Sequence, residues 1–305
     1  MNILVIGGNG FIGSHLVDYL LSHGHYVRVY DISYERFRKP LSNVDYRISS
    51  IENTSDLYES LLGIDIVFHL ASASVPSSSN VDTVSDINNN LIPTLNILNL
   101  VVKLGIRRIV FFSSGGAVYG NPLLKKSIPE EHPLQPISSY GIIKSTTENY
   151  LFLYKKLHDL KPLILRPSNA YGPRQGHFLA HGVISTFLRK INMNESITVY
   201  GDGFSIKDYI YVSDLIEICY KLSLSDKDGI YNIGSGEGTS INKIIDKIKI
   251  ITGEDPKINY TNSQVYDVDH FVLDISKVKN ELKWTPTVSL DTGIKLVWNS
   301  INSKG

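Results

Sequence analysis

The 305-residue sequence is poor in the features that mark several large classes of protein. It has one cysteine, Cys219, which excludes an intramolecular disulfide framework and indicates a reducing compartment. Its 30 basic and 30 acidic residues give a formal net charge of zero, so nothing points to nucleic acid or an anionic membrane as partner. No apolar run approaches the roughly 18 residues of a membrane span, and the chain enters an apolar strand at once, without a signal peptide. We therefore expect a cytoplasmic protein with no nucleic-acid or membrane partner.

The first thirty residues follow the order strand, glycine loop, helix, strand, acid. The apolar run Ile3-Leu-Val-Ile6 is typical of a buried parallel strand, and it ends in Gly7-Gly-Asn-Gly-Phe-Ile-Gly13. A helix is predicted from about Phe11 to His23, and a second strand from Tyr26 to Tyr30. Glycines in such a loop let the backbone approach a pyrophosphate, which then lies at the helix N-terminus. The sequence therefore predicts a dinucleotide site.

The residue after the second predicted strand bears on the choice of cofactor. Asp31 can bind both ribose hydroxyls of NAD and would repel the 2′-phosphate of NADP. A glycine turn followed by a chance aspartate is the plainer alternative, but the ordered succession of elements favours NAD. Arg36 and Arg38 follow soon after and could reach a 2′-phosphate, so the sequence leaves NADP open.

Strand and helix patterns alternate through the first 170 residues. This alternation predicts an α/β fold of Rossmann type, with a doubly wound parallel sheet in a domain of residues 1–170. Beyond it the regularity breaks down, which indicates a smaller C-terminal α/β substrate-binding domain of residues 171–305, with strands near 206–232 able to return to the first domain. Further strands are predicted at 44–48, 64–70, 109–112, 163–165, 197–200, 208–212 and 230–233, and helices at 86–103, 139–158 and 182–191.

Tyr140 and Lys144 are four residues apart in one of these predicted helices, so their side chains share a face. An ammonium group near a phenol favours phenolate, and a tyrosine tuned in this way can exchange a proton with an alcohol. The same spacing occurs by chance in many helices. The pair therefore indicates catalysis only together with the predicted dinucleotide site.

Several ordered motifs together give the chain a resemblance to a known family. The motifs cover nearly the whole chain: Gly7-Gly-Asn-Gly-Phe-Ile-Gly13, Phe68-His-Leu-Ala71, Asn90, Ser113-Ser-Gly-Gly-Ala-Val-Tyr-Gly120, Tyr140 with Lys144, Arg166-Pro-Ser-Asn169, Tyr200-Gly-Asp-Gly203, Lys207-Asp-Tyr-Ile-Tyr-Val212, Asn232-Ile-Gly-Ser-Gly236 and Leu273-Asp-Ile-Ser-Lys277. With them, the chain resembles the extended short-chain dehydrogenases/reductases, specifically the NAD-dependent nucleotide-sugar epimerase and dehydratase family, and within it most closely the UDP-hexose 4-epimerases.

The resemblance implies a 4-epimerase of a nucleotide-activated hexose, with UDP as the expected carrier, in surface-polysaccharide or sugar-nucleotide metabolism. Tyr140, as phenolate, would take the proton of the sugar 4-hydroxyl while C4 passes hydride to tightly bound NAD. The 4-keto sugar would rotate, and hydride and proton would return to the other face. Lys144 would hold the nicotinamide ribose and lower the pKa of Tyr140.

The resemblance also assigns binding residues and a partner. It implies no metal, and a homodimer through the helices at 86–103 and 139–158. The expected cofactor contacts are Gly7, Gly10, Phe11, Ile12, Gly13, Asp31, Ser50, Ile51, Leu70, Ala71, Ser72, Asn90, Ser113, Tyr140, Lys144 and Pro167, and the expected substrate contacts are Ser114, Asn169, Val183, Tyr200, Lys207, Gln264 and Asp267.

The chain departs from the family pattern at the hydroxyl that would stabilise charge on the 4-oxygen. Gly115 stands where relatives carry serine or threonine, and we expect Ser114, rather than Ser113, to take its place as a third catalytic residue. A 4,6-dehydratase would need an acid and a base at Gly116 and Ala117, and neither residue can transfer a proton.

The expected grip on the substrate diphosphate is also altered. Lys207 and Gln264 occupy the positions of two arginines, so one bidentate fork and one charge are lost. Arg174 and His177 are candidates to compensate. Ser50 stands where an aspartate often contacts the adenine.

Two other functions fit the same motifs. A 4-keto reductase of a nucleotide-deoxysugar would use Tyr140 and Lys144 but consume NAD(P)H, and a non-catalytic dinucleotide-binding protein would sense the redox state. Asp31 and the Tyr200-Gly-Asp-Gly203 motif favour the epimerase, and the intact Tyr140 and Lys144 pair argues against the sensor. The sequence specifies neither the sugar nor the nucleotide.

Overall fold

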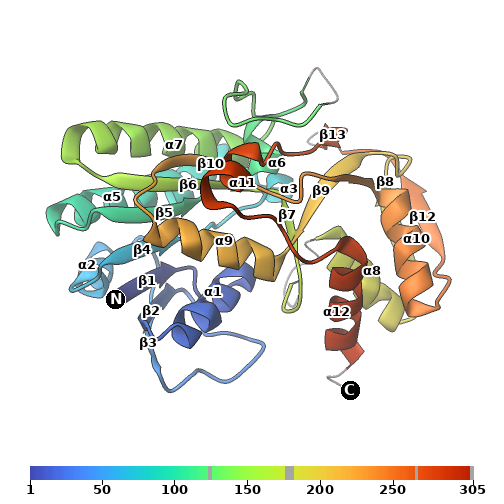
Figure 1. Ribbon diagram of the computed structural model, residues 1–305, viewed down its shortest axis with the longest axis horizontal. Helices are drawn as coiled ribbons and strands as arrows, with labels where there is room; N and C mark the ends of the chain where they lie inside the picture. Colours follow the sequence, from blue (N-terminus) through green and yellow to red (C-terminus); the bar gives the residue numbers. More distant parts are fainter. Residues whose placement is uncertain (123–125, 176–181, 265–266, 303–305) are drawn as a thin grey trace. The chain divides into compact units, whose positions relative to one another are not determined.

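A computed structural model describes residues 1–122, 126–175, 182–264 and 267–302 of the chain (Figure 1). The chain forms two compact units that alternate along the sequence. The first unit comprises residues 1–119, 133–166 and 216–231, and the second comprises residues 120–132, 167–215 and 232–305. The change of unit near residue 166 lies close to the expected boundary at 170, and the short stretch 216–231 returns to the first unit.

The first unit is built on a seven-stranded sheet, which confirms the Rossmann-type fold. Every pairing from β3 to β6 is parallel. The order reverses between β1 and β4, so the carboxyl ends of these two strands leave a crevice at the point where ligands bind in such sheets. Across the sheet the strands are β10 (Gly229–Ile233), β6 (Lys161–Pro167), β5 (Arg108–Phe112), β4 (Ile66–His69), β1 (Asn2–Ile6), β2 (Tyr26–Asp31) and β3 (Val44–Ile48).

Helices cover the sheet of the first unit on both faces (Figure 1). α7 is the longest, with 20 residues. Within the described ranges, no helix combines the length and the apolar character needed to cross a membrane. The helices are α1 (Phe11–Ser22), α2 (Thr54–Leu61), α3 (Pro76–Ser79), α4 (Thr83–Asp86), α5 (Ile92–Lys103), α6 (Gly115–Val118), α7 (Ser139–His158) and α9 (Val212–Leu224), with a π-helical turn, η1 (Ile87–Leu91).

Alternation along the strands divides the core of the first unit between the two faces. Leu4 and Ile6 of β1 pack in one cluster with residues of α2, α5 and α7. Ile3 and Val5, which are also fully buried, point to the other face because successive side chains of a strand alternate. A strand buried on both faces needs a continuous apolar run, and this requirement explains why the run at residues 3–6 predicted β1 correctly.

The helix expected over residues 86–103 is interrupted. α4 ends at Asp86, η1 occupies Ile87–Leu91, and α5 begins at Ile92, with Pro93 in its first turn. Proline has no backbone N–H and crowds the preceding turn, so a regular α-helix cannot run through it unchanged. A π-turn adds one residue to the helical path, and such turns are frequent at functional sites.

α7 begins at a position fixed by both capping and packing. The Ser138 hydroxyl accepts a hydrogen bond from the Gly141 N–H at 3.2 Å, which caps the helix. A side chain at Gly141 would place its Cβ 2.4 Å from the Ala117 carbonyl oxygen. The absence of a side chain therefore lets the first turn of α7, which carries Tyr140, lie directly on α6.

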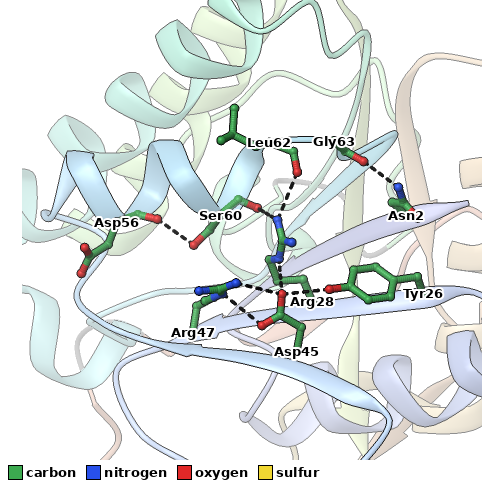
Figure 2. Close-up of polar contacts among 9 residues, drawn as sticks. All are labelled: Asn2, Tyr26, Arg28, Asp45, Arg47, Asp56, Ser60, Leu62 and Gly63. Carbon is green, nitrogen blue, oxygen red and sulfur yellow. Dashed lines mark hydrogen bonds and ion pairs between the residues drawn. The ribbon is translucent and has the colours of Figure 1, made fainter.

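The edge strand β3 is attached by a charged pair (Figure 2). Arg28 on β2 and Asp45 on β3 stand directly opposite each other, and the Arg28 Nε donates to Asp45 at 2.7 Å. The guanidinium also donates to the carbonyl oxygens of Ser60 at 2.9 Å and Leu62 at 3.2 Å. A cation at the last carbonyls of a helix favours its C-terminus, so Arg28 holds both β3 and the end of α2.

The second unit combines two small sheets with four helices in its described residues. β9 (Ile206–Tyr211) pairs with β7 (Asn169–Tyr171), β11 (Gly238–Ser240) and β13 (His270–Phe271), and β8 (Ile197–Tyr200) pairs with β12 (Ile258–Thr261). Its apolar cluster is formed by residues of β7, β8, β9, α8, α10 and α12. The helices are α8 (Val183–Asn192), α10 (Ile241–Thr252), α11 (Ser276–Leu282) and α12 (Leu290–Asn302).

A buried ion pair lies in the first unit between β6 and α7. Arg166, 2% exposed, donates from Nε and an Nη to the Glu148 carboxylate at 3.0 and 2.5 Å. Its other Nη donates to the Tyr119 hydroxyl at 2.7 Å, and the guanidinium lies 4.8 Å from the centre of that ring. The Ser113 hydroxyl donates to Glu148 at 2.5 Å. One carboxylate thus joins the ends of β5 and β6 to α7.

Replacing Glu148 tests how far the first unit depends on this pair. Glu148→Gln leaves the Arg166 guanidinium buried without its counter-charge, so the free energy of unfolding should fall by about 3–5 kcal/mol. Chemical denaturation measures the loss. Glu217→Gln removes the half-buried partner of the exposed Lys221 and should cost less than about 1 kcal/mol. Equal losses in the two variants would contradict the central role of the buried pair.

Candidate functional site

The glycine loop after β1 packs against the end of β4. Gly7 has a φ of +85°, and a Cβ there would lie 2.6 Å from the Ala71 backbone nitrogen. A Cβ on Gly13 would lie 2.1 Å from the Gly7 carbonyl oxygen. Leu70 and Ala71 both donate their N–H to the Ile6 carbonyl, at 2.9 and 3.0 Å. Side chains are therefore excluded by the close packing of the loop on itself and on the end of β4, and this tight glycine turn fits a dinucleotide-binding loop.

The N-terminus of α1 follows this loop and is suited to an anion. Gly10 caps the helix with an extended backbone, and α1 begins at Phe11, followed by Ile12 and Gly13. In the described part of the chain, no side chain caps this first turn, and the turn contains no acidic residue. The positive end of the helix dipole and the first-turn N–H groups therefore provide the electrostatics that a phosphate requires.

Asp31 lies at the end of β2, half-buried. Its carboxylate accepts the Asn9 N–H at 2.9 Å. Burial raises the pKa of Asp31, against the lowering effect of backbone hydrogen bonds from Asn9, Ser33 and Ile32. The position suits hydrogen bonding to ribose hydroxyls and disfavours a further negative charge.

The two arginines considered for a 2′-phosphate differ in what holds them. Arg38 forms ion pairs with Asp18 and Glu35, each at 2.5 Å, so its guanidinium is already engaged by two carboxylates. Arg36 is exposed. Two carboxylates around Arg38 reduce its attraction for a phosphate, which weakens the alternative of NADP.

The residues expected near the adenine lie at the end of β3. The Ser50 carbonyl accepts the Tyr30 hydroxyl at 2.8 Å, and the Ser50 hydroxyl accepts the Glu52 N–H at 3.3 Å. Ile51 is half-buried and packs against the apolar cluster of the first unit. The serine hydroxyl is therefore placed in a turn in which it can still donate a hydrogen bond.

A small hollow lies in the first unit between the end of β4 and α7. Five of its lining residues were expected from the sequence: Ala71, Ser72, Asn90, Tyr140 and Lys144. The other five were not: Ser74, Thr94, Phe111, Ile143 and Thr147. The fold thus brings the expected tyrosine and lysine together with the end of β4, where Ala71 packs against Gly7 of the glycine loop.

Tyr140 is half-buried and shares a hydrogen bond with the Ser114 side chain. Burial raises the pKa of Tyr140 to about 12, opposed by the Ser114 hydrogen bond and reinforced by the charge of Asp86. The pKa of Tyr140 as a whole therefore lies above its ordinary value, and the effect of Lys144 on it stays a prediction. The Lys144 ammonium lies 5.5 Å from the centre of the Tyr140 ring, above its face.

Lys144 is buried under the end of β5. Its ammonium donates to the Phe112 carbonyl at 2.9 Å and lies 4.8 Å from the centre of the Phe111 ring. Burial lowers the pKa of Lys144 to about 8, against the opposing effects of Glu148 and Asp86. The Lys144 side chain is therefore mostly protonated at neutral pH and loses its positive charge as the pH rises through about 8.

The two serines before Gly115 differ in their partners. Ser113 donates its hydroxyl to the buried Glu148 carboxylate and so belongs to the ion-pair network. Ser114 stands at the N-terminus of α6 and bonds to Tyr140 instead. The geometry therefore favours Ser114 as the hydroxyl that replaces the one missing at Gly115.

Sequence reasoning missed the polar cluster beneath Asn90. The Asn90 side-chain oxygen accepts the Ala73 N–H at 2.7 Å, and its nitrogen donates to the Asp86 carboxylate at 2.8 Å. Asp86 is 4% exposed and also accepts the Ser139 hydroxyl at 2.6 Å. The spacing of four between Asp86 and Asn90 was the available signal, because it places both on one face of a helix.

His69 is a second buried group that the sequence did not single out. It bonds through Nε2 to the Thr94 hydroxyl at 2.9 Å, and Thr94 donates its hydrogen to the Asn90 carbonyl at 2.6 Å. The His69 Nε2 must therefore be the donor. Burial, and then the charge of Lys144, lowers the pKa of His69 to about 3, so the imidazole is neutral.

The expected substrate residues belong to the second unit, apart from Ser114. Asn169 donates its side-chain N–H to the Asp208 carbonyl at 3.0 Å, and the Gln264 carbonyl accepts the Asp267 N–H at 3.0 Å. Lys207 donates to the Val268 carbonyl, and burial lowers its pKa, against the charges of Asp267 and Asp269.

The remaining expected residues occupy varied positions. Pro167, an expected cofactor contact, is buried at the end of β6, and Val183 is the first residue of α8. Tyr200 is 54% exposed. Arg174 has a φ of +71°, and His177 lies outside the described residues.

The low pKa of Lys144 predicts a pH-dependent stability. Between pH 8 and 10.5 the unfolded chain binds more protons at this lysine than the folded chain, so the free energy of unfolding rises with pH. Relative to Lys144→Met, the native protein should gain roughly 2 kcal/mol between pH 8 and pH 10. Denaturation at the two pH values measures it. Lys155→Met, at an exposed position of the same helix, is the control, and a difference between the native protein and Lys144→Met that does not change with pH would refute the assignment.

Known proteins share this architecture over their whole length. A protein of Methanocaldococcus jannaschii named "Putative UDP-glucose 4-epimerase" is 37% identical over 299 residues, which cover 97% of each chain. A dTDP-4-dehydro-6-deoxyglucose reductase of Escherichia coli is 34% identical over 99% of this chain and 98% of its own. The solved structure of a Thermotoga maritima UDP-glucose 4-epimerase with UDP-glucose superimposes with a TM-score of 0.95, at 36% identity, over 100% of this chain and 99% of its own. A model of the NAD dependent epimerase/dehydratase family matches residues 3–234, and the chain belongs to that family.

Proposed function

We propose that the protein is an NAD-dependent 4-epimerase of a nucleotide-activated hexose, most simply a UDP-sugar. The observation that carries the proposal is the placement of Tyr140, with Ser114 bonded to it and Lys144 beside its ring, in a hollow that is also lined by Ala71 and Ser72 at the end of β4. The 4-epimerase names of two similar proteins support this reaction.

In the proposed reaction, hydride transfer and proton transfer are carried out by different groups. A bound nicotinamide ring supplies the acceptor and the donor of hydride. Tyr140 takes the proton of the 4-hydroxyl and returns it after the sugar has turned. For this role the pKa of Tyr140 must fall from about 12 toward neutrality. The positive charges of Lys144 and of the oxidised ring would lower it, because they favour the phenolate.

Ser114 would complete the proton-transfer group. A hydroxyl can donate one hydrogen bond and accept two, so Ser114 can remain bonded to Tyr140 while it contacts the substrate oxygen on C4. This arrangement replaces the hydroxyl that Gly115 lacks. It also assigns Ser113 to holding Glu148 rather than to the reaction.

The second unit would hold the nucleotide diphosphate through a less charged set of groups than two arginines. Lys207 and Asn169 are already bonded to backbone carbonyls, and Gln264 is neutral. Hydrogen bonds to charged donors are about twice as strong as neutral ones, so we expect a weaker grip on the diphosphate. The side chain of Tyr200 is largely exposed and offers an aromatic face on which the nucleobase of the substrate could stack.

A second candidate function is a 4-keto reductase of a nucleotide-deoxysugar, favoured by the Escherichia coli reductase that is 34% identical to this chain. Turnover without added cofactor distinguishes the epimerase, because its hydride returns to the sugar. A reductase consumes NAD(P)H in proportion to product. A decarboxylase acting on UDP-glucuronate would release carbon dioxide, and a redox sensor would turn over none of these sugars.

The Tyr140→Phe variant tests the proposed base. It removes the proton acceptor and keeps the ring, so kcat for 4-epimerisation should fall at least about 10³-fold while bound NAD is retained. Proton NMR with UDP-glucose, UDP-N-acetylglucosamine and UDP-glucuronate, without added cofactor, detects the 4-epimer of each.

Tyr154→Phe makes the same chemical change on the same helix. Its hydroxyl donates to Asn99 at 2.5 Å, away from the hollow, so activity should remain within about twofold of the native value. Full activity of Tyr140→Phe would exclude the proposed mechanism.

We also propose that two copies associate through α5 and α7. These helices present large apolar side chains to solvent, among them Ile92 at 46%, Ile142 at 52%, Leu153 at 46% and Leu157 at 62% exposure. Burying such a face on a second copy removes apolar area from water. Sedimentation equilibrium at micromolar concentration should give twice the chain mass, and Ile142→Arg with Leu153→Arg should give the monomer. A native monomer would refute the dimer.

A further inference from the structure

Asp86 is a buried carboxylate beside the proposed base to which neither the sequence motifs nor the mechanism above gives a role. It is the last residue of α4, and 4% of its surface is exposed. Buried carboxylates are rare unless they are paired or fully hydrogen-bonded, because desolvation of the charge is costly. Its partners here are two neutral groups, the Ser139 hydroxyl at 2.6 Å and the Asn90 amide at 2.8 Å.

These two bonds connect the parts of the site that must stay in register. Ser139 directly precedes Tyr140 in the first turn of α7. Asn90 lies in η1 and accepts the Ala73 N–H at 2.7 Å, so it fixes the small-residue loop after β4. Through Asp86, the backbone that carries Tyr140 is tied to the loop that faces the cofactor.

The charge of Asp86 acts on the same two residues as the reaction. It raises the pKa of Tyr140, and it raises that of Lys144 against the stronger effect of burial. The other groups facing the pair are the Ser114 hydroxyl from α6, Glu148 from α7 and His69 from β4. Of these, Ser114 carries no charge and His69 is neutral, so Asp86 and Glu148 are the negative charges and Lys144 is the positive one.

We propose that Asp86 is a positioning residue for the reaction at Tyr140, whose carboxylate fixes the first turn of α7 and sets the pH range in which Tyr140 acts as a base. The catalytic role of Tyr140 in this proposal rests on the proposed function. The effect of the Asp86 charge on the Tyr140 proton does not depend on it. A negative charge beside a phenol raises its pKa and keeps it protonated. Tyr140 is therefore available as phenolate, the form that accepts the substrate proton, when positive charge around it lowers that pKa.

Asp86→Asn tests the charge while it retains a hydrogen-bonding side chain of the same size. The rising limb of kcat/KM against pH should move about one unit toward acid, because removal of the charge lowers the proton affinity of the Tyr140 and Lys144 pair. The control is Asp82→Asn, the same change at the exposed N-cap of α4, where asparagine caps equally well. Asp82→Asn should leave the rising part of the kcat/KM pH profile unchanged.

A titration of Tyr140 itself separates this inference from the proposed function. The ¹³Cζ resonance of Tyr140 in tyrosine-labelled protein is identified by its loss in Tyr140→Phe. At pH 10.5, below the midpoint, the phenolate fraction of Tyr140 should be roughly tenfold larger in Asp86→Asn than in the native chain. Ser139→Ala removes one hydrogen bond and no charge, so it should lower stability without this change.

The outcomes are distinct. The proposal would be overturned if Asp86→Asn changed neither the phenolate fraction of Tyr140 nor the pH dependence of kcat/KM. It would also be overturned if Ser139→Ala changed the phenolate fraction as much as Asp86→Asn does. A larger phenolate fraction in a protein that epimerises no sugar would refute the proposed function and support the role of Asp86. Asp86→Ser, also neutral, serves the same comparison if the asparagine variant does not fold.

Discussion

The geometry of the first unit depends on one buried pair of opposite charges, Arg166 with Glu148. Each side chain is 2% exposed, and the carboxylate also accepts the Ser113 hydroxyl while the guanidinium meets Tyr119. Two charges taken out of water cost several kcal/mol each, and only a fixed set of partners offsets that cost. The ends of β5 and β6 and the middle of α7 are therefore held in one arrangement, in which Lys144 lies one turn before Glu148 on the same helix.

Contacts that tolerate no side chain fix the loop after β1 against the end of β4, whose Ala71 lines the hollow. The Gly13 and Gly7 backbones touch, and Gly7 touches Ala71, so the loop after β1 and the end of β4 form one surface. Gly141 makes a similar contact with α6, because its lack of a side chain lets the turn that carries Tyr140 pack directly against Ala117. Backbone contact on both sides leaves little freedom in the distance between the cofactor loop and the tyrosine.

Much of this arrangement could be predicted from sequence because its causes are local. The apolar run at residues 3–6, the glycines after it and Asp31 each express a constraint within one strand or one turn, and the Rossmann-type sheet followed from their order. The pKa of Tyr140 could not be predicted, because it depends on burial and on Asp86, which lies 54 positions earlier in the chain. The assignment of Ser113 to Glu148 likewise required a contact across 35 residues. The second unit was expected only in outline, because its short strands carry weak periodicity.

The π-turn between α4 and α5 makes the length of this segment a constraint in its own right. An α-helix rotates by about 100° per residue, so a single extra residue changes the direction of everything before it relative to everything after it. Here the turn lets α5 keep its apolar side on the core while Asn90 lines the hollow and Asp86 bonds to Asn90 and Ser139. A deletion of one residue between 87 and 91 would swing Asp86 away from Ser139 without altering any side chain of the site. Among homologous chains, spacing in this segment should therefore be conserved even where residue identity is not.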